Sequence, residues 1–202
     1  MKIIARKIND SDSELKKYGI KELQDGLTLE ILKKKYTWIL RAKIKDAVLG
    51  LKHSAIAWKN GTWIDGTWVD GTWIAGIWKY GIWENGAWDK GIWENGIWKN
   101  GTWFDGTWEN GTWFDGIWKY GIWKNGTWVD GTWFDGLWKN GTWFDGLWKK
   151  GTWIDGTWFD GIWRNGLWKK GTRVDGTWFD GIWENGTWKN GTWENGLWKK
   201  GT

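Results

Sequence analysis

The chain of 202 residues contains 29 Trp and 32 Gly but neither Pro nor Cys, which excludes a disulfide framework and a cysteine metal site. Such a skewed composition is typical of a repeat protein. The net charge of +5 is uneven: residues 1–57 hold 13 Lys/Arg and 7 Asp/Glu, whereas residues 58–202 hold 16 and 17. The near-neutral second part lacks the basic footprint of a nucleic-acid-binding protein, which argues against a nucleic-acid partner.

The first residues do not have the pattern of a targeting segment. Met1 to Arg6 is followed at once by polar residues, so an apolar core of a signal peptide is missing. Nor does any run of about 18 apolar residues occur. We therefore expect neither a signal peptide nor a transmembrane segment, and no membrane partner.

Residues 1–57 predict a small α+β domain that caps the end of the repeat array or docks to a partner. The spacing of Ser11 to Glu14 resembles a capping box before a short helix over 15–18, which Gly19 ends. Residues 28–36 predict a second helix and residues 37–44 a strand. Ala42-x-Ile44 and Ala47-x-Leu49 stand one pentapeptide apart, so a degenerate first repeat is expected near residue 42.

This segment has two compatible roles. A solenoid needs its open end covered, because unpaired strand edges aggregate. The same segment also offers a basic cluster for docking to a partner, made of Lys33, Lys34, Lys35, Arg41, Lys43 and Lys45.

From Trp58 to Thr202 the chain repeats one five-residue unit, [Thr/Ile/Leu]-Trp-x-[Asp/Asn]-Gly. Trp occupies every fifth position from 58 to 198 except at Arg173, and Gly follows three positions later every time. Asp-Gly and Asn-Gly favour turns, and the other three positions favour extended chain. The central Trp then faces one side and its two neighbours the other.

The pattern thus assigns structural roles to three sets of residues. The Trp side chains are expected to form a dry internal ladder, represented by Trp58, Trp63, Trp68, Trp103, Trp133 and Trp178. The corner turns are represented by Gly61, Gly66, Gly86 and Gly106. Outward aromatic side chains available for partner contact are Phe104, Phe114, Phe134, Phe144, Phe159 and Phe179.

Two all-β architectures fit a turn in every pentapeptide. In a β-solenoid each pentapeptide is one edge of a coil, and four pentapeptides close a square coil. In an antiparallel β-meander of three-residue strands, successive turns would alternate in type, so the pattern would repeat only at every second pentapeptide. The Trp and the corner instead repeat at every pentapeptide, so we expect the square β-solenoid, with the meander as the alternative.

The period is similar to that of the pentapeptide-repeat superfamily, whose members form right-handed square β-helices. The Trp-x-[Asp/Asn]-Gly pattern also resembles Trp/Gly-rich repeat proteins of tailed bacteriophages. This resemblance implies a virion-associated protein, such as a tail or decoration component, located in the virion or the host cytoplasm. A mimic of DNA, known among pentapeptide-repeat proteins, needs a strongly acidic face, and the array's net charge of −1 argues against it.

No chemistry of catalysis or metal binding is expected. His53 is the only histidine and has no motif around it, no phosphate-binding fingerprint occurs, and the Asp residues recur as turn residues. We predict a non-enzymatic structural or assembly protein without cofactor, a rigid scaffold for other protein subunits, with self-association through the C-terminal end. The alternative is a carbohydrate-binding or adhesion module that uses exposed Trp.

Overall fold

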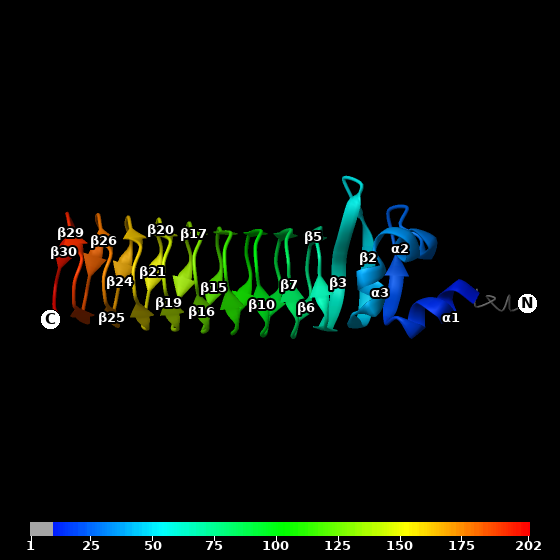
Figure 1. Ribbon diagram of the computed structural model, residues 1–202, viewed down its shortest axis with the longest axis horizontal. Coiled ribbons are helices and arrows are strands. Elements are labelled where there is room, and N and C mark those ends of the chain that lie inside the picture. The colour runs from blue at the N-terminus through cyan, green and yellow to red at the C-terminus, as the bar shows by residue number, and fades with distance from the viewer. Residues whose placement is uncertain (1–9) are drawn as a thin grey trace, which may run out of the picture.

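The computed structural model describes residues 10–202, which form a rod with a small domain at its N-terminal end (Figure 1). Residues 1–6, the segment considered for a signal peptide, lie outside the described part. The helices and strands of the first domain are α1 (Asp10–Lys17), β1 (Ile20–Leu23), α2 (Leu29–Lys35), α3 (Thr37–Arg41) and β2 (Lys43–Lys52).

The second predicted helix is confirmed and the predicted strand over 37–44 is wrong. Thr28 caps α2, because its Oγ1 accepts a hydrogen bond of 3.2 Å from the N–H of Ile31. Residues 37–41 are helical despite their β-branched and aromatic composition. Ile39 is buried and Trp38 packs on the rod, so tertiary packing overrides strand propensity here. Helix α1 already includes Ser11, so that residue is not its cap.

The antiparallel hairpin of β2 and β3 (Ala55–Asp65) joins the first domain to the rod. His53 and Ser54 form its two-residue turn with φ of 51° and 66°, as a type I′ turn requires. The expectation of a degenerate coil from residue 42 is therefore wrong. Ala42 and Ala47 instead lie against the first corners, because a Cβ on Gly66 or Gly61 would meet them within 3.0 Å.

The rest of the chain is a parallel β-solenoid, as predicted, but its coil has three edges instead of four. Trp103 pairs with Trp88 before it and Trp118 after it, each three pentapeptides away, and this register holds throughout the rod. The antiparallel meander is excluded by the same parallel pairing. About nine turns stacked at the ~4.8 Å strand spacing give a rod roughly 45 Å long.

Each face of the rod collects every third pentapeptide, and we number the faces in the order in which the chain reaches them. Face 1 continues from the Trp58 part of β3 through β5 (Thr72–Trp73), β8 (Ala87–Trp88), β11 (Thr102–Trp103), β14 (Ile117–Trp118), β17 (Thr132–Trp133), β20 (Leu147–Trp148), β23 (Ile162–Trp163), β26 (Thr177–Trp178) and β29 (Thr192–Trp193). Face 2 continues from the Trp63 part of β3 through β6 (Ile77–Trp78), β9 (Ile92–Trp93), β12 (Thr107–Trp108), β15 (Ile122–Trp123), β18 (Leu137–Trp138), β21 (Thr152–Trp153), β24 (Leu167–Trp168), β27 (Ile182–Trp183) and β30 (Leu197–Trp198).

Face 3 is a separate nine-stranded sheet. It consists of β4 (Thr67–Trp68), β7 (Ile82–Trp83), β10 (Ile97–Trp98), β13 (Thr112–Trp113), β16 (Thr127–Trp128), β19 (Thr142–Trp143), β22 (Thr157–Trp158), β25 (Thr172–Arg173) and β28 (Thr187–Trp188).

The size of indole explains the three-edged coil. Successive Trp rings around one coil meet edge to face, as Trp118 and Trp123 do at 5.9 Å and 74°. Rings in successive coils stack, as Trp118 and Trp133 do at 4.8 Å and 6°. Three indoles therefore fill the triangular interior, whereas a square coil would enclose more space for the same edge length.

The first domain closes one end of the rod. Strand β2 pairs with β3 along the edges that carry Trp58 and Trp63, where Leu49 and Ile44 lie opposite these residues. On the third face, Trp38 of α3 meets Trp68 edge to face at 4.9 Å. All three rings of the first coil are thereby covered from the N-terminal side.

Candidate functional site

The structure places the predicted Trp ladder inside the rod. Trp side chains from Trp58 to Trp183 are fully buried. The indole N–H groups of these rings have no hydrogen-bond partner, so ring stacking and edge-to-face contacts hold the interior. At 150–250 Å² buried per ring and ~25 cal/mol per Å², each Trp contributes roughly 4–6 kcal/mol. The predicted ladder residues Trp58, Trp63, Trp68, Trp103, Trp133 and Trp178 all belong to this set.

The predicted corner residues Gly61, Gly66, Gly86 and Gly106 turn the chain with φ between 118° and 130°, a region that only Gly adopts readily. The corners also stack tightly on one another. A Cβ on Gly106 would lie 2.5 Å from the carbonyl oxygen of Gly91 in the preceding coil. At many corners the Asp or Asn side chain before the Gly accepts a hydrogen bond from the N–H of that Gly, as Asp105 Oδ1 does at 2.7 Å.

Arg173 is the one interruption of the Trp interior, and it is fully buried. Its guanidinium lies 5.0 Å from the Trp158 ring and 4.7 Å from the Trp188 ring, and it has no hydrogen-bond partner among the described residues. Burial lowers the pKa of Arg173 to about 9, although the nearby charges of Asp160 and Asp175 oppose this shift. The site is a buried cation that the surrounding indole faces stabilise only in part.

The three faces differ sharply in charge, which the near-neutral total conceals. The strand register assigns each outward residue to one face. Face 1 has six cations and five carboxylates, a charge of +1, and face 2 has seven cations and five carboxylates, a charge of +2. Face 3 has two lysines against seven carboxylates, a charge of −5. The premise that the array lacks a strongly acidic face is therefore wrong.

On face 1 the outward Phe residues are covered by cations of the neighbouring coil. Lys119 Nζ lies 4.5 Å from the ring centre of Phe104, and Lys149 Nζ lies 3.8 Å from that of Phe134. Arg164 approaches Phe179 in the same way at 5.8 Å. These three predicted partner-contact residues thus already have cationic neighbours within the chain.

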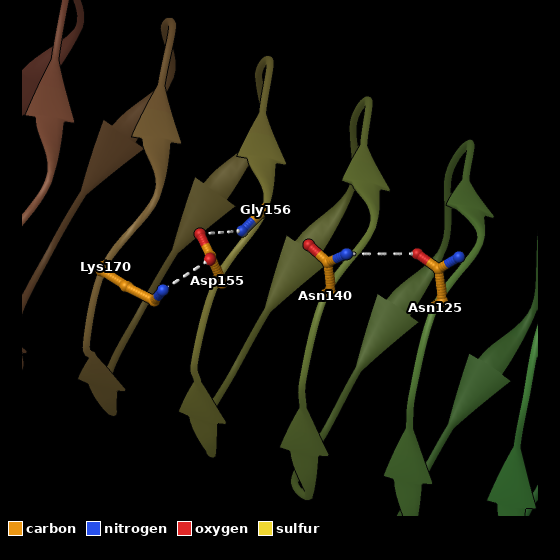
Figure 2. A network of polar contacts seen from close by, with 5 residues as sticks. All are labelled: Asn125, Asn140, Asp155, Gly156 and Lys170. Atoms are coloured by element: carbon orange, nitrogen blue, oxygen red, sulfur yellow. Dashed lines mark hydrogen bonds and ion pairs between the residues drawn. The ribbon is translucent and has the colours of Figure 1, made fainter.

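On face 2, polar side chains of successive coils pair with one another in a column that runs along the corner (Figure 2). Asn140 donates to Asn125 at 3.5 Å, and Lys170 pairs with Asp155 at 2.9 Å. Partial burial raises the pKa of Asp155, but the hydrogen bonds from Lys170 and the Gly156 N–H, with the lysine charge, outweigh it and lower the pKa overall. Lys124 and Glu109 form a similar pair at 2.8 Å on this face.

Face 3 carries an uninterrupted acidic and apolar strip, which we call the acidic strip. It consists of the outward pairs in five successive coils: Phe114 with Asp115, Val129 with Asp130, Phe144 with Asp145, Phe159 with Asp160, and Val174 with Asp175. None of these carboxylates forms an ion pair with another described residue. The predicted contact residues Phe114, Phe144 and Phe159 lie here, and no described cation stacks on them; the rings of Phe144 and Phe159 stack at 5.0 Å.

The basic residues of the first domain fall into two groups. Lys33, Lys34 and Lys35 lie exposed on α2, where a hydrogen bond from Lys33 to Glu14 raises the pKa of Lys33. A separate open cavity of about 520 Å³ is lined by Lys16, Lys21 and Lys45 together with apolar residues and Asp46. Arg41 and Lys43 line a smaller adjoining cavity.

At the other end of the rod the last Trp rings are less covered. Trp188 and Trp193 are half-buried, and 39% of the Trp198 side chain is exposed. These are the rings at the predicted self-association end.

Within residues 10–202, no cluster of three or more His, Asp or Glu side chains is arranged to hold a metal ion. His53 lies exposed at the tip of the β2–β3 hairpin. None of the helices in this part of the chain is both long and apolar enough to cross a membrane. No family model, curated protein or solved structure gives a significant match to this chain.

Proposed function

We propose that the protein is a non-enzymatic structural scaffold, a stiff rod that holds protein partners at fixed positions along its length. The observation that carries this proposal is the stacked indole interior, which is continuous on faces 1 and 2. On face 1 its rings stack at 4.7 Å between Trp88 and Trp103 and still at 4.7 Å between Trp163 and Trp178, far along the rod. An interior without a break in its middle coils suits a spacer better than a protein that must open around a substrate.

Amide hydrogen exchange tests this proposal. A scaffold rod is expected to show uniform strong protection across the coils from Trp63 to Trp168, with faster exchange only towards the ends. A weakly protected window in the central coils, matched by a change on addition of a small-molecule ligand, would contradict it.

The virion is the proposed place of this scaffold, and that part rests on the resemblance to Trp/Gly-rich repeat proteins of tailed bacteriophages. Peptides of this chain are then expected in purified particles at a fixed copy number, measured by quantitative mass spectrometry. Their absence from particles, with the chain present in the infected cell, would sink the virion assignment and leave the scaffold proposal standing.

Self-association through the last coil is part of the same proposal, supported by the exposure of Trp198. Substituting Trp198→Lys is expected to lower the weight-average mass in sedimentation equilibrium at high concentration. A wild-type chain that stays monomeric there would rule it out. The carbohydrate-binding alternative needs Trp platforms on the surface, whereas the rings from Trp58 to Trp183 lie inside the rod.

A further inference from the structure

The carboxylates of the acidic strip have no ion-pair partner among the described residues, whereas several carboxylates of face 2 do. On face 2 several carboxylates are paired with a lysine in an adjacent coil, as Glu109 is with Lys124 and Asp155 is with Lys170. Within the strip, the position next to each Asp but the last in the following coil holds another Asp, as Asp130 follows Asp115 and Asp145 follows Asp130. The only described side-chain donor from a neighbouring coil is Asn190, which donates to Asp175 Oδ2 at 3.1 Å at the end of the strip.

The strip is rigid and its carboxylates are held in one orientation. Oδ1 of Asp130, Asp145 and Asp160 each accept the N–H of the following Gly at 2.6 Å. The backbone N–H of Asp145 also donates to Val129 in the preceding coil, at 3.0 Å. The second carboxylate oxygen of Asp130, Asp145 and Asp160 accepts no hydrogen bond within the described chain, and these side chains are exposed.

Beside this column lies an exposed apolar column, in which Phe114 is 46% and Phe144 is 44% exposed. On face 1 the same kind of Phe is covered by a cation from the chain itself, as Lys149 covers Phe134. The acidic strip therefore offers the two groups that cations contact on the other faces, the carboxylate as on face 2 and the aromatic ring as on face 1, but contains no outward cation of its own.

We propose that the acidic strip is the docking surface for a cationic polypeptide segment of a partner protein, rich in Arg or Lys, which lies along the rod axis. The proposal deepens the scaffold function and rests on it, because the stiff rod holds the carboxylates in line. Five coils span about 20 Å at the ~4.8 Å spacing, the reach of roughly six extended residues. The charge complementarity is with guanidinium groups above all, since these pair with carboxylates and stack on aromatic rings.

The spacing of the charges distinguishes this surface from an imitation of nucleic acid. Duplex DNA carries one negative charge per ~1.7 Å along two strands, whereas the strip carries one charge per coil in a single column. A metal ion is also disfavoured, because no group of three acidic side chains in the described chain converges on one point.

The test compares two triple variants that remove three negative charges from Thr-Trp-x-Asp-Gly units on different faces. The first replaces Asp115→Asn, Asp130→Asn and Asp145→Asn in the strip. The second replaces Asp105→Asn, Asp135→Asn and Asp180→Asn, which lie in Thr-Trp-Phe-Asp-Gly units on face 1. Asn preserves the corner in both, because Asn95 and Asn100 already accept the N–H of their Gly at 2.8 and 2.7 Å.

Labelled hexa-arginine and hexalysine are titrated with each protein, and binding is followed by fluorescence anisotropy at low salt. We expect the strip variant to bind hexa-arginine at least about tenfold more weakly, a loss of ~1.4 kcal/mol, and the face 1 variant to stay near wild type. Hexa-arginine is expected to bind the wild type more tightly than hexalysine, and added salt to weaken both.

Equal weakening in the two variants would mean that only net charge matters, and that result overturns the proposal, as does a wild type that binds neither peptide. Sedimentation of the wild type alone tests whether the strip binds a second copy of this chain. If the wild type associates and the strip variant does not, another copy is the occupant, and the proposal of a separate partner protein is overturned. Calcium binding that is lost only in the strip variant would also overturn the proposal, because the strip would then be a cation site. Unchanged hydrogen exchange in the coils keeps the scaffold function intact whichever result is obtained.

Discussion

Arg173 is the residue whose chemistry disagrees most with its surroundings. Its guanidinium replaces an indole in a fully buried position, between Trp158 and Trp188, and has no hydrogen-bond partner among the described residues. Cation–π contacts return only part of the desolvation cost of such a charge. The rod tolerates this cost because many fully buried rings stabilise the coils on either side.

Restoring the missing ring is expected to stabilise the rod. Arg173→Trp removes the buried charge and allows stacking on Trp158 and Trp188, so the free energy of unfolding should rise by about 2–4 kcal/mol. Arg173→Leu removes the charge without filling the volume and should give a smaller gain. Denaturant titrations of the three proteins measure this, and a destabilised Arg173→Trp variant would show that the guanidinium stabilises the folded rod.

The same site predicts a pH dependence. Burial lowers the pKa of Arg173 to about 9, below its unfolded value, so from about pH 9 upwards to the unfolded pKa the folded chain binds fewer protons than the unfolded chain. Wild-type stability therefore rises with pH in that window, relative to Arg173→Trp, and the full penalty is present below pH 9. The difference in unfolding free energy between the two proteins should narrow from about pH 8 to pH 10.5; a constant difference would contradict the shift.

The corner is the element on which each coil depends. Gly126 has φ of 126°, and a Cβ there would lie 2.4 Å from the carbonyl oxygen of Gly111. Gly26 of the first domain also has a positive φ, 77°, but a Cβ there would meet nothing within 4 Å. Substitutions at these two positions therefore distinguish the cost of backbone strain from the cost of collision with a neighbouring coil.

Gly126→Ala is expected to cost at least about 4 kcal/mol, because strain and collision combine, whereas Gly26→Ala should cost roughly 1–2 kcal/mol from strain alone. Thermal unfolding followed by the near-ultraviolet circular dichroism of the Trp rings measures both variants. Equal losses would mean that the corners relax freely and that the close Gly column is not a constraint.

At the scale of the whole molecule, the three-edged coil decides which residues share a face. Every pentapeptide has the same backbone, so removing one should leave the interior intact but move every later pentapeptide to the preceding face. Removing three in succession should shorten the rod by one coil and leave the faces aligned. The acidic strip is the feature that reports the difference.

Deleting residues 147–151 is expected to divide the strip, leaving Asp145 on face 3 and shifting Asp160 to face 2. Deleting residues 147–161 should leave four carboxylates in one column. Both proteins should fold, with Trp emission that remains blue-shifted and protected from quenchers. Hexa-arginine should bind the one-pentapeptide deletion several-fold more weakly than the three-pentapeptide deletion; similar affinities would argue that the alignment of the strip does not matter.

Much of the fold follows from local rules that the sequence displays. Alternation across an extended segment places Trp103 inward and Phe104 outward, and Gly at each corner follows from its positive φ. The number of edges per coil does not follow from any single unit, because it depends on how indoles from different coils pack. The helical conformation of Thr37–Arg41 was missed for a similar reason, since Trp38 packs on rings distant in the sequence.

The acidic strip was missed because it exists only at a period of three pentapeptides. Arranged in rows of four pentapeptides, Asp115, Asp130 and Asp145 scatter over different faces, whereas rows of three place them in one column. A signal for the correct period was present in the charges. Lys99 follows Glu84, and Lys124 follows Glu109, by three pentapeptides in each case, and these are ion pairs in the structure.

The stacked indoles have an optical consequence. Rings held parallel at 4.7–4.8 Å, as Trp98, Trp113 and their neighbours are, couple their electronic transitions, so light absorbed at one ring is shared with the rings above and below it. The rod therefore contains three chromophore columns that run side by side. Two are continuous, and the third is interrupted at Arg173, where a guanidinium that does not absorb in the near ultraviolet separates Trp158 from Trp188.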